Sequence, residues 1–333
     1  MPEGHSVHRI ARQFELNFTG APVAVSSPQG RFAAGAAELD GHAIVQAKAV
    51  GKQMFLEFDH ELWLRVHLGL YGAWDFAGDI SVDDTLMSAS GRMGQTNQRG
   101  TVPGAADEAR TVIGAHEDSP WSIGAPRRAR LRMSEGEKLG DLSETWPPPP
   151  VGQVRVRLLT ETACADLRGP TACEVQTIEE VDRQIAKLGP DPLVDAPEVG
   201  EERFVAVVRR KPTPIGLLLM DQAVVSGIGN VYRAELLFRA RLDPFRPGRE
   251  IPEELVRELW RDWTHLLRIG VSTGQMLTMD DLDEEAYRKA LASRDDRHWV
   301  YHRTGEPCRV CGTNIAMTEL AARKLYWCPN CQV

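Results

Sequence analysis

Two cysteine pairs, Cys308-Arg309-Val310-Cys311 and Cys328-Pro329-Asn330-Cys331, decide the fold of the C-terminal part of this chain. Residues 312–327 join them, a length that suits a hairpin. Two Cys-x2-Cys pairs at this spacing place four thiolates around one tetrahedral Zn²⁺ at ~2.3 Å. Four protein ligands leave no coordination position open, so we expect one structural zinc in a zinc ribbon over residues 298–333. A redox-active dithiol is the alternative, disfavoured because no βαβ pattern surrounds the pairs.

The segment before the ribbon, residues 200–295, is typical of an all-helical domain. Pro252 begins a long amphipathic pattern with Leu255, Leu259, Trp263 and Leu266 on one face. Thr213-Pro214 is a good N-cap and first-turn pair for a helix that runs to about Val225.

The motif Gly227-Ile228-Gly229-Asn230 separates that helix from the next one. Two glycines let the backbone approach a ligand closely, and the N–H groups that begin the following helix favour an anion. A DNA phosphate would fit, with the Asn230 side chain as a further donor. A simple helix C-cap followed by an N-cap explains the motif equally well.

The N-terminal part, residues 1–180, predicts a β-sandwich with one leading helix over residues 5–18. Ala43–Val50 and Gln53–Phe58 flank the turn Gly51-Lys52, and the segments from Leu62 to Leu70 and from Val154 to Leu158 alternate as half-buried strands do. The whole chain is therefore expected to be an α+β multidomain protein.

A stretch of about residues 83–150 interrupts this domain. It is rich in Ser, Gly, Asp and Arg and ends in four prolines, Pro147–Pro150. Little periodicity over such a length indicates a mobile insertion. Its basic cluster at residues 127–130 could touch DNA, although a solvated loop is the simpler interpretation. Cys164 and Cys173, which lie beyond the insertion, receive no role from the sequence and are expected to be buried free thiols.

Composition limits the function only loosely. The formal net charge of −8 is no guide to DNA binding, because a local basic surface decides it. No apolar run approaches the ~20 residues that span a bilayer, and the first residues lack the features of a signal peptide. We therefore expect a cytoplasmic protein with no membrane partner.

The start of the chain, Met1-Pro2-Glu3-Gly4, offers a nucleophile. Removal of Met1 exposes the secondary amine of Pro2, which titrates near ~8 and so is partly neutral at cellular pH. A neutral amine can attack a sugar C1′ and form an iminium ion, and Glu3 beside it can move the protons. Without further context, this is an ordinary N-terminus.

The context is a series of motifs that occur in order: Met1–Gly4, Gly51-Lys52, His67–Gly72, Asp166–Pro170, Gly227–Tyr232 and the zinc ribbon. Together they resemble the formamidopyrimidine-DNA glycosylase/endonuclease VIII family over nearly the whole chain outside the insertion. The first residues and the pair Leu70-Tyr71 are similar to the actinobacterial endonuclease VIII branch. The resemblance implies a β-sandwich, a helix–two-turns–helix domain and a zinc ribbon, with DNA in the cleft between the first two.

The resemblance also implies roles for single residues. Pro2 would be the Schiff-base nucleophile, Glu3 the general acid/base and Lys52 a lysine that reaches the phosphate and sugar. Phosphate contacts would come from Asn230, Gly229 and Arg323, and further DNA contacts from Leu70, Tyr71 and Arg168, of which Leu70 and Tyr71 would fill the space of a flipped-out base. Read without the family, Lys52 is a solvated turn residue, and Leu70 and Tyr71 end a strand.

The expected activity is that of a bifunctional DNA glycosylase and abasic-site lyase of base excision repair, which needs no organic cofactor. The expected substrates are oxidised pyrimidines such as thymine glycol in double-stranded DNA, bound by a monomer. His5 and the insertion depart from the family pattern, which leaves substrate preference open. The alternatives are excision of 8-oxoguanine or formamidopyrimidines, a non-catalytic DNA-binding member, and a zinc-ribbon adaptor for protein partners.

Overall fold

The computed structural model of the protein describes residues 2–81, 121–124, 146–279, 282–293 and 295–333, without the side chains of residues 121, 122 and 292. The chain forms two compact units. Unit 1 combines residues 1–185 with residues 271–275, and unit 2 combines residues 186–270 with residues 276–333. Unit 2 thus holds both the helical segment and the ribbon.

Unit 1 contains two antiparallel sheets. The first has the strand order β2-β3-β4-β9, and the second has the order β1-β7-β8-β5-β6. Their bounds are β1 Ala24–Ser26, β2 Ile44–Val50, β3 Gln53–Phe58, β4 Leu62–His67, β5 Ala73–Gly78, β6 Trp121–Gly124, β7 Val154–Leu159, β8 Ala163–Arg168 and β9 Ala172–Thr177. The helices of this unit are α1 Gly4–Phe18, α2 Ala33–Leu39 and α4 Ile178–Ile185.

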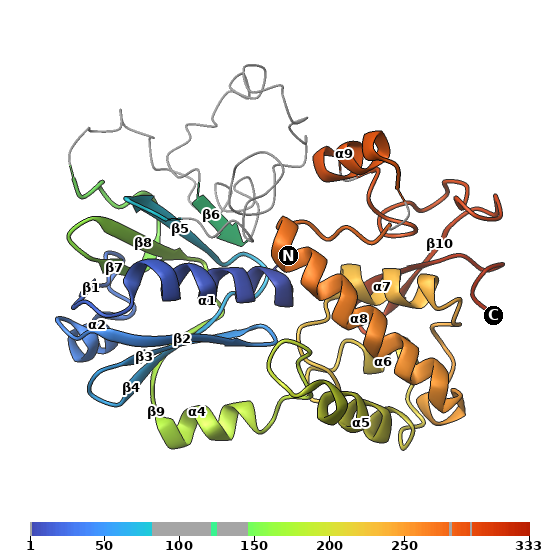
Figure 1. Ribbon diagram of the computed structural model, residues 1–333, viewed down its shortest axis with the longest axis horizontal. Coiled ribbons are helices and arrows are strands. Elements are labelled where there is room, and N and C mark those ends of the chain that lie inside the picture. The colour runs from blue at the N-terminus through green and yellow to red at the C-terminus, as the bar shows by residue number, and fades with distance from the viewer. Residues whose placement is uncertain (1, 82–120, 125–145, 280–281, 294) are drawn as a thin grey trace. The chain divides into compact units, whose positions relative to one another are not determined.

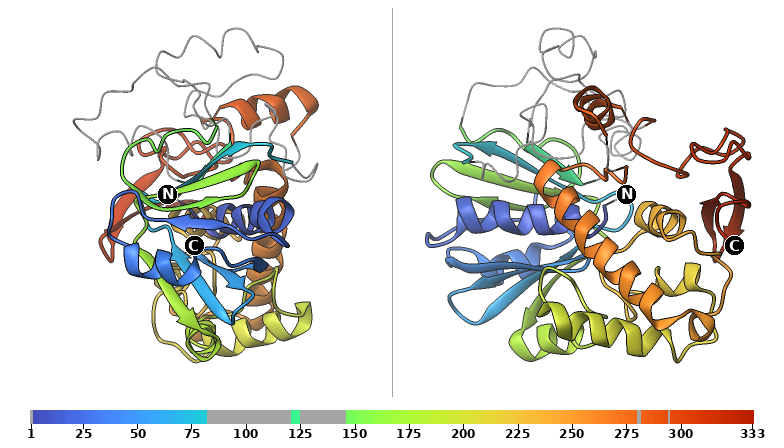
Figure 2. Two further views of the ribbon diagram at one scale, coloured as in Figure 1. Left: turned by 90° about the vertical axis from the view of Figure 1, so that its left-hand side faces the viewer. Right: turned by 45° about the vertical axis from the view of Figure 1, so that its right-hand side comes forward.

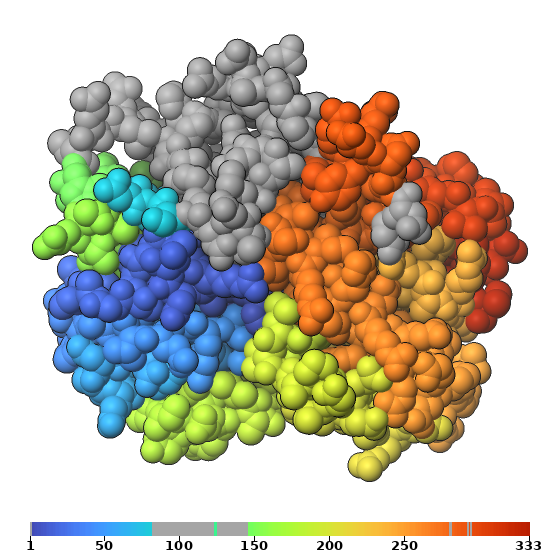
Figure 3. Space-filling view, in the orientation of Figure 1, coloured from blue at the N-terminus to red at the C-terminus, as the bar shows by residue number. Residues whose placement is uncertain are grey.

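Helix α1 lies between the two sheets (Figures 1 and 2). Its apolar stripe of Val7, Ile10, Phe14 and Phe18 belongs to the same buried core as side chains of both sheets. The ring of Phe14 packs edge-on against Trp74 of β5, with 4.8 Å between the ring centroids. The outer face of α1 reaches the surface, as the space-filling view shows (Figure 3). One leading helix therefore joins both layers of the sandwich.

The segment 83–150 is not structureless throughout. Trp121–Gly124 forms β6, which pairs antiparallel with β5, and the side chain of Ile123 is buried. A strand of 4 residues is too short to show a period in the sequence, which is why the interpretation of the whole stretch as an insertion was too broad there. The basic cluster at residues 127–130 lies outside the described residues.

Unit 2 consists of helices and one hairpin. Its helices are α5 Pro197–Val208, α6 Ile215–Leu218, α7 Asn230–Arg239, η3 Gly248–Glu250, α8 Glu253–Thr273 (whose last residues belong to unit 1) and α9 Glu284–Ala292, and its strands are β10 Ala316–Leu320 and β11 Arg323–Trp327. Helix α7 packs on the ribbon through Ala234 and Phe238, which share a buried cluster with Tyr326. None of the helices in the described residues is long and apolar enough to cross a bilayer.

The predicted helix from Pro214 to about Val225 was wrong in its length. Helix α6 ends at Leu218, and Pro214 rather than Thr213 occupies its N-cap position. Polar side chains beyond it bond to nearby backbone: the Asp221 carboxylate accepts from the Ala223 N–H, and the Gln222 amide donates to two carbonyls. These local bonds give the chain an alternative to further helical turns.

Candidate active site

Pro2 and Glu3 lie at the start of α1. Both are buried, and Glu3 is the extended N-cap residue of the helix. Its backbone carbonyl accepts a hydrogen bond from the Ser6 N–H at 3.0 Å, whereas its carboxylate forms no capping hydrogen bond. A buried carboxylate directly beside Pro2 is the arrangement that acid/base assistance to a Pro2 amine requires.

Polar residues follow inside the first two turns of α1, where His5, Ser6, His8 and Arg9 are all buried. Burial, with the nearby positive charge of Arg9, lowers the pKa of His5 to about 3, so its imidazole is neutral at pH 7. The Arg9 guanidinium donates to the carbonyls of Val271 and Ser272, which belong to the second stretch of unit 1, residues 271–275. The side chains buried around the start of α1 are therefore mainly polar, whereas those buried further along the helix are apolar.

Lys52 lies in the tight turn between β2 and β3. Gly51 adopts a φ of 59°, the left-handed region that glycine enters without strain, and Lys52 follows it half-buried. The next residue, Gln53, pairs with His67 across β3 and β4. Burial and then the charge of Lys52 lower the pKa of His67, so this imidazole is mostly neutral at pH 7. A neutral His67 leaves Lys52 as the cation of this turn.

Leu70 and Tyr71 project from the turn between β4 and β5. Their side chains are 40% and 47% exposed, large fractions for apolar residues. Gly69 has a φ of 65°, and a Cβ atom there would lie 1.8 Å from the Thr171 hydroxyl oxygen. Close backbone packing thus holds the turn while its two largest side chains face outward, as insertion into a base stack requires.

Arg168, at the end of β8, has partners inside the sheet. Its guanidinium pairs with the buried Asp75 carboxylate of β5 and donates to the Val151 carbonyl. The side chain is 19% exposed. These contacts tie β8 to β5 beside the turn that carries Leu70 and Tyr71, so the described geometry gives Arg168 a supporting position.

The glycine turn before α7 is held by one side chain. The Gln222 amide donates to the Ile228 carbonyl at 3.0 Å and its oxygen accepts from the Gly227 N–H at 3.1 Å. Gly227 has a φ of 90°, which a residue with a side chain rarely adopts. Gly229 is the extended N-cap residue, and Asn230 begins the helix, so both lie where backbone N–H groups point out of a helix start.

The Asn230 side chain is fixed against the ribbon hairpin. Its amide donates to the Lys324 carbonyl at 2.8 Å, and its oxygen accepts from the buried Arg233 guanidinium. Arg233 donates to the same Lys324 carbonyl at 3.3 Å. This link holds the backbone next to Arg323, whose own side chain is exposed at the beginning of β11. Asn230 and Arg323 are therefore brought together within unit 2.

The turn that carries Arg323 is strained. Ala321 and Ala322 connect β10 to β11 with φ values of 50° and 58°. A two-residue hairpin needs positive φ at both central positions, and non-glycine residues enter that region at a cost of about 1 kcal/mol each. Strain of this kind concentrates at sites where a loop must present a side chain.

Glu235, one turn further along α7, anchors the chain that leads into the ribbon. Its carboxylate accepts from the backbone N–H groups of Trp299, Val300 and Tyr301 at 2.8–2.9 Å and from the Thr278 hydroxyl at 2.5 Å. Burial raises the pKa of Glu235, and these four hydrogen bonds act in the opposite direction. All four partners belong to unit 2, so this residue fixes α7 relative to the ribbon.

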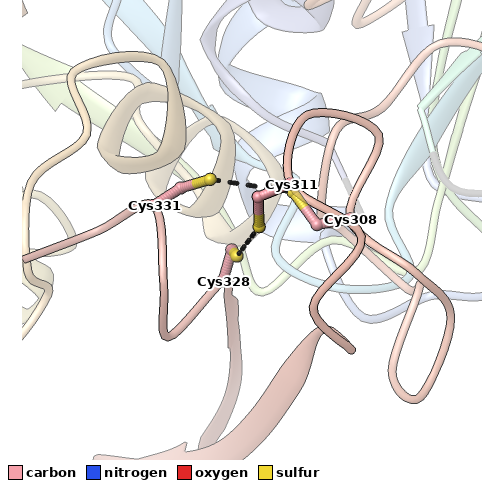
Figure 4. A group of neighbouring side chains, drawn as sticks. All are labelled: Cys308, Cys311, Cys328 and Cys331. Carbon is pink, nitrogen blue, oxygen red and sulfur yellow. Dashed lines mark hydrogen bonds between the residues drawn. The ribbon is translucent and has the colours of Figure 1, made fainter.

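The four ribbon cysteines converge as a zinc site requires (Figure 4). The sulfur atoms of Cys311 and Cys328 lie 3.4 Å apart, those of Cys308 and Cys331 lie 3.9 Å apart, and all four lie within 4.8 Å of one another. Zinc at ~2.3 Å from each sulfur of a tetrahedron separates them by about 3.8 Å. The residues fit one structural Zn²⁺, and the ion completes its coordination with protein ligands alone.

Two site residues were missed in the sequence, Arg233 and Glu235. The available signal was charge inside a helix that is otherwise apolar on every side, since Val231, Leu236 and Leu237 surround them. Such charges must find partners when they are buried. Most of the partners are backbone groups far along the chain, such as Lys324 and residues 299–301, and these could not be read from the sequence.

Three family models match most of the chain. The model of the formamidopyrimidine-DNA glycosylase N-terminal domain matches residues 1–173, the H2TH domain of the same glycosylase matches residues 188–281, and a zinc finger found in FPG and IleRS matches residues 305–333. A curated relative, "Endonuclease 8 1" of Mycobacterium tuberculosis, is 37% identical over 332 residues and covers 100% of both chains. The "Formamidopyrimidine-DNA glycosylase" of Thermus thermophilus is 36% identical over 44% of this chain and 54% of its own.

Solved structures show the same fold. The MutM (Fpg) protein of Thermus thermophilus superposes with a TM-score of 0.65 at 22% identity, covering 99% of this chain and 98% of its own. The Lactococcus lactis Fpg in complex with DNA that contains an abasic site gives a TM-score of 0.66 at 18% identity, covering 99% of each chain.

The two sheets, the helical unit and the four-cysteine ribbon together define a DNA glycosylase of base excision repair. The chain belongs to the formamidopyrimidine-DNA glycosylase/endonuclease VIII family, whose enzymes are DNA glycosylases with abasic-site lyase activity.

Proposed function

We propose that the protein removes oxidised pyrimidines, such as thymine glycol, from damaged double-stranded DNA and then nicks the strand. The observation that carries this substrate class is the full-length identity of 37% to "Endonuclease 8 1", against a match over 44% of the chain to the formamidopyrimidine enzyme of Thermus thermophilus. The pair Leu70-Tyr71, whose sequence is similar to the endonuclease VIII branch, is partly exposed at its turn and supports the same assignment.

The proposed chemistry begins at Pro2. Once Met1 is removed, the lone pair of the Pro2 nitrogen forms a bond to the sugar C1′ and the N-glycosidic bond breaks. The base leaves with the electron pair of that broken bond and takes up a proton, while the Pro2 nitrogen loses its own. Opening of the sugar ring gives an iminium ion that joins Pro2 to C1′. Loss of a proton from C2′ then expels the 3′ phosphate, and a second elimination expels the 5′ phosphate. The structural zinc takes no part in these steps.

Glu3 supplies and receives the protons in this scheme. Its buried carboxyl group follows Pro2 directly in the chain, so it can protonate the opening sugar and later accept the C2′ proton. Lys52, which is half-buried in the β2–β3 turn, would bind the phosphate and sugar of the damaged nucleotide. A neutral His67 beside Lys52 adds no competing charge.

The remaining residues would hold the DNA. Arg323 and the N–H groups at Gly229 and Asn230 would contact phosphates, because a helix start and an exposed guanidinium both favour anions. Leu70 and Tyr71 would occupy the stack that the flipped base leaves, with Arg168 supporting their turn from inside the sheet. The protein is proposed to act as a monomer in the bacterial cytoplasm, associated with the nucleoid when it is bound to DNA.

Excision of 8-oxoguanine or formamidopyrimidines is the second candidate, because the family models that match residues 1–173 and 188–281 carry the formamidopyrimidine name. Untagged protein should be incubated with matched duplexes that contain thymine glycol, dihydrouracil, 8-oxoguanine or an abasic site. Faster release of the pyrimidine lesions supports the proposal. Faster release of 8-oxoguanine transfers the assignment to the second candidate, and DNA binding without any cleavage would mean a non-catalytic member.

A further inference from the structure

A second cluster of metal-ligating side chains lies in unit 1, away from the ribbon. His42 precedes β2, and Asp59 and His60 follow β3, so all three lie at one end of the β2–β3 hairpin. One potential ligand atom from each residue lies within 4.8 Å of the other two. Lys52 lies at the other end of the same hairpin, and the 7 residues of β2 separate the two ends by roughly 20 Å. The cluster is therefore distinct from the proposed catalytic residues.

Asp59 is the centre of the cluster. Its Oδ1 atom lies 2.8 Å from the Nδ1 atom of His42 and 3.6 Å from the Nδ1 atom of His60. The second oxygen, Oδ2, accepts a hydrogen bond from the Ala43 N–H at 3.1 Å. That hydrogen bond and the one from His42 hold the carboxylate in place and leave both of its oxygens at the centre of the cluster.

The hydrogen bonding of His60 determines which of its ring nitrogens is a potential ligand. Its Nε2 atom lies 3.0 Å from the Glu38 carbonyl oxygen, which can only accept a hydrogen bond. Nε2 must therefore carry the proton, and in the neutral ring Nδ1 carries the lone pair. That Nδ1 atom is buried and has no hydrogen-bond partner among the described residues. In the neutral ring, the lone pair of Nδ1 thus faces the Asp59 oxygen.

We propose that His42, Asp59 and His60 bind a divalent transition-metal ion of the zinc class. Ligand atoms at about 2.1 Å from such an ion are about 3.0 Å apart in octahedral and about 3.4 Å apart in tetrahedral geometry. The two distances at Asp59, 2.8 and 3.6 Å, lie on either side of these values. Two imidazoles and one carboxylate select such an ion over Mg²⁺ or Ca²⁺, which prefer oxygen ligands alone.

The surroundings of the cluster match those of known metal sites. A metal-binding histidine usually donates its other ring N–H to a carbonyl, as His60 does to Glu38, and a metal-binding carboxylate usually accepts a further hydrogen bond, as Asp59 does from Ala43. The side chains of His42 and Asp59 are 40% and 45% exposed, so water can complete the coordination.

Binding requires two local changes. The rings of His42 and His60 are stacked with their centroids 3.5 Å apart, and they must tilt to point both lone pairs at one ion. The ion also replaces the proton on His42 Nδ1, which is released to solvent. An ion held in this way would join the end of the hairpin to α2, whose penultimate residue is Glu38, and it would stabilise unit 1 without entering the reaction.

The test is equilibrium dialysis of untagged protein, already loaded with zinc in its ribbon, against buffered micromolar Zn²⁺. Elemental analysis should then find two zinc ions per wild-type chain and one in His42→Ala and in His60→Ala. Asp59→Asn, which preserves the shape, should weaken binding of the second ion by about tenfold or more. His265→Ala, at an exposed position of α8, is the matched control and should retain two ions.

The ribbon zinc in every variant reports on unit 2, and a thermal melt without added zinc reports on the folding of unit 1. Added zinc should raise the melting midpoint of wild type and of His265→Ala, but not that of His42→Ala or His60→Ala. A single zinc ion in the wild-type protein would overturn the proposal. The cluster would then be two stacked histidines, one of which is hydrogen-bonded to Asp59. Two zinc ions in both alanine variants would overturn it as well, because the second ion would then lie elsewhere.

Discussion

His5 is a titratable group that the fold keeps neutral. Its pKa is lowered from 6.5 to about 3 by burial and by Arg9, so folding excludes a proton that the unfolded chain binds below pH 6.5. The stability contributed by this group is complete above pH 6.5 and is lost as the pH falls from 6.5 towards 3. We expect the free energy of unfolding to fall over this range by about 1.4 kcal/mol per pH unit on account of this one imidazole.

His5→Gln should reduce that acid dependence, and urea unfolding at a series of pH values measures it. His265→Gln removes an imidazole from an exposed position of α8 and serves as the control. An unchanged pH dependence in His5→Gln would mean that the buried imidazole is not the group that titrates.

Glu235→Gln should destabilise unit 2 by about 1–3 kcal/mol. One oxygen of Glu235 accepts from Trp299 and the other from Val300 and Tyr301. Replacing either oxygen by an NH₂ group therefore leaves at least one of these buried backbone N–H groups without its acceptor. Thermal or urea unfolding measures the change, and Glu258→Gln, at an exposed position of α8, is the matched control. Equal stability of the two variants would contradict the anchoring role of Glu235.

Substitutions in the turn that carries Leu70 and Tyr71 should affect base excision and leave folding stability nearly unchanged. Both side chains are largely exposed, so the double variant Leu70→Ala/Tyr71→Ala should change stability by no more than about 0.5 kcal/mol per residue. Base excision from duplex DNA should fall about tenfold or more, because unstacking a base costs a few kcal/mol and 1.36 kcal/mol corresponds to a factor of ten. Single-turnover excision measures this loss. An undiminished rate would exclude the wedge role.

The β10–β11 hairpin presents the exposed Arg323, whose proposed phosphate contact can be tested. Arg323→Ala should weaken binding to abasic-site DNA and lower the slope of log affinity against log salt by about one, because one phosphate contact is lost. Arg288→Ala removes an exposed arginine from α9 and is the control. Zinc content should be unchanged in both variants. A salt slope equal to that of wild type would show that Arg323 contacts no phosphate.

Helices and strands with a strong hydrophobic period could be predicted from the sequence. Those whose bounds depend on individual hydrogen bonds or on pairing with a distant strand could not. The predicted helix over residues 5–18 corresponds to α1, and the hairpin around Gly51-Lys52 is present with the expected strands. Helix α6 was predicted too long because Asp221 and Gln222 form local bonds that no periodicity reveals. Strand β6 was missed because its pairing with β5 depends on a contact across a long sequence separation.

The same limit applies to the candidate site. The four cysteines were selected by residue type and spacing, and they do converge in the structure. Pro2 and Glu3 were selected by their place at the N-terminus together with the family resemblance, and their roles remain predictions. Arg233 and Glu235 depend on backbone groups of residues 299–301 and 324, which only the tertiary fold brings near them. Residue chemistry is therefore readable from the sequence, whereas the groups that position those residues require the fold.

For the whole molecule, full-length similarity to known glycosylases is a better guide to action on DNA than the net charge of the chain. The chain carries a formal charge of −8 and nevertheless belongs to a family of DNA glycosylases, because DNA contacts depend on local groups such as an exposed guanidinium or a helix start. At cellular ionic strength, salt screens charges that are more than ~8 Å apart, so contacts made at close range decide DNA binding.

The N-terminal amine of Pro2 is the proposed nucleophile. Borohydride reduction traps an iminium ion as a stable amine, so untagged protein incubated with an abasic-site duplex should give a covalent protein–DNA adduct. Pro2→Gly should lose most base removal, and a variant with an N-terminal extension that blocks the amine should give no adduct and no excision. Full adduct formation by the blocked protein would contradict the account and assign the nucleophile to another residue.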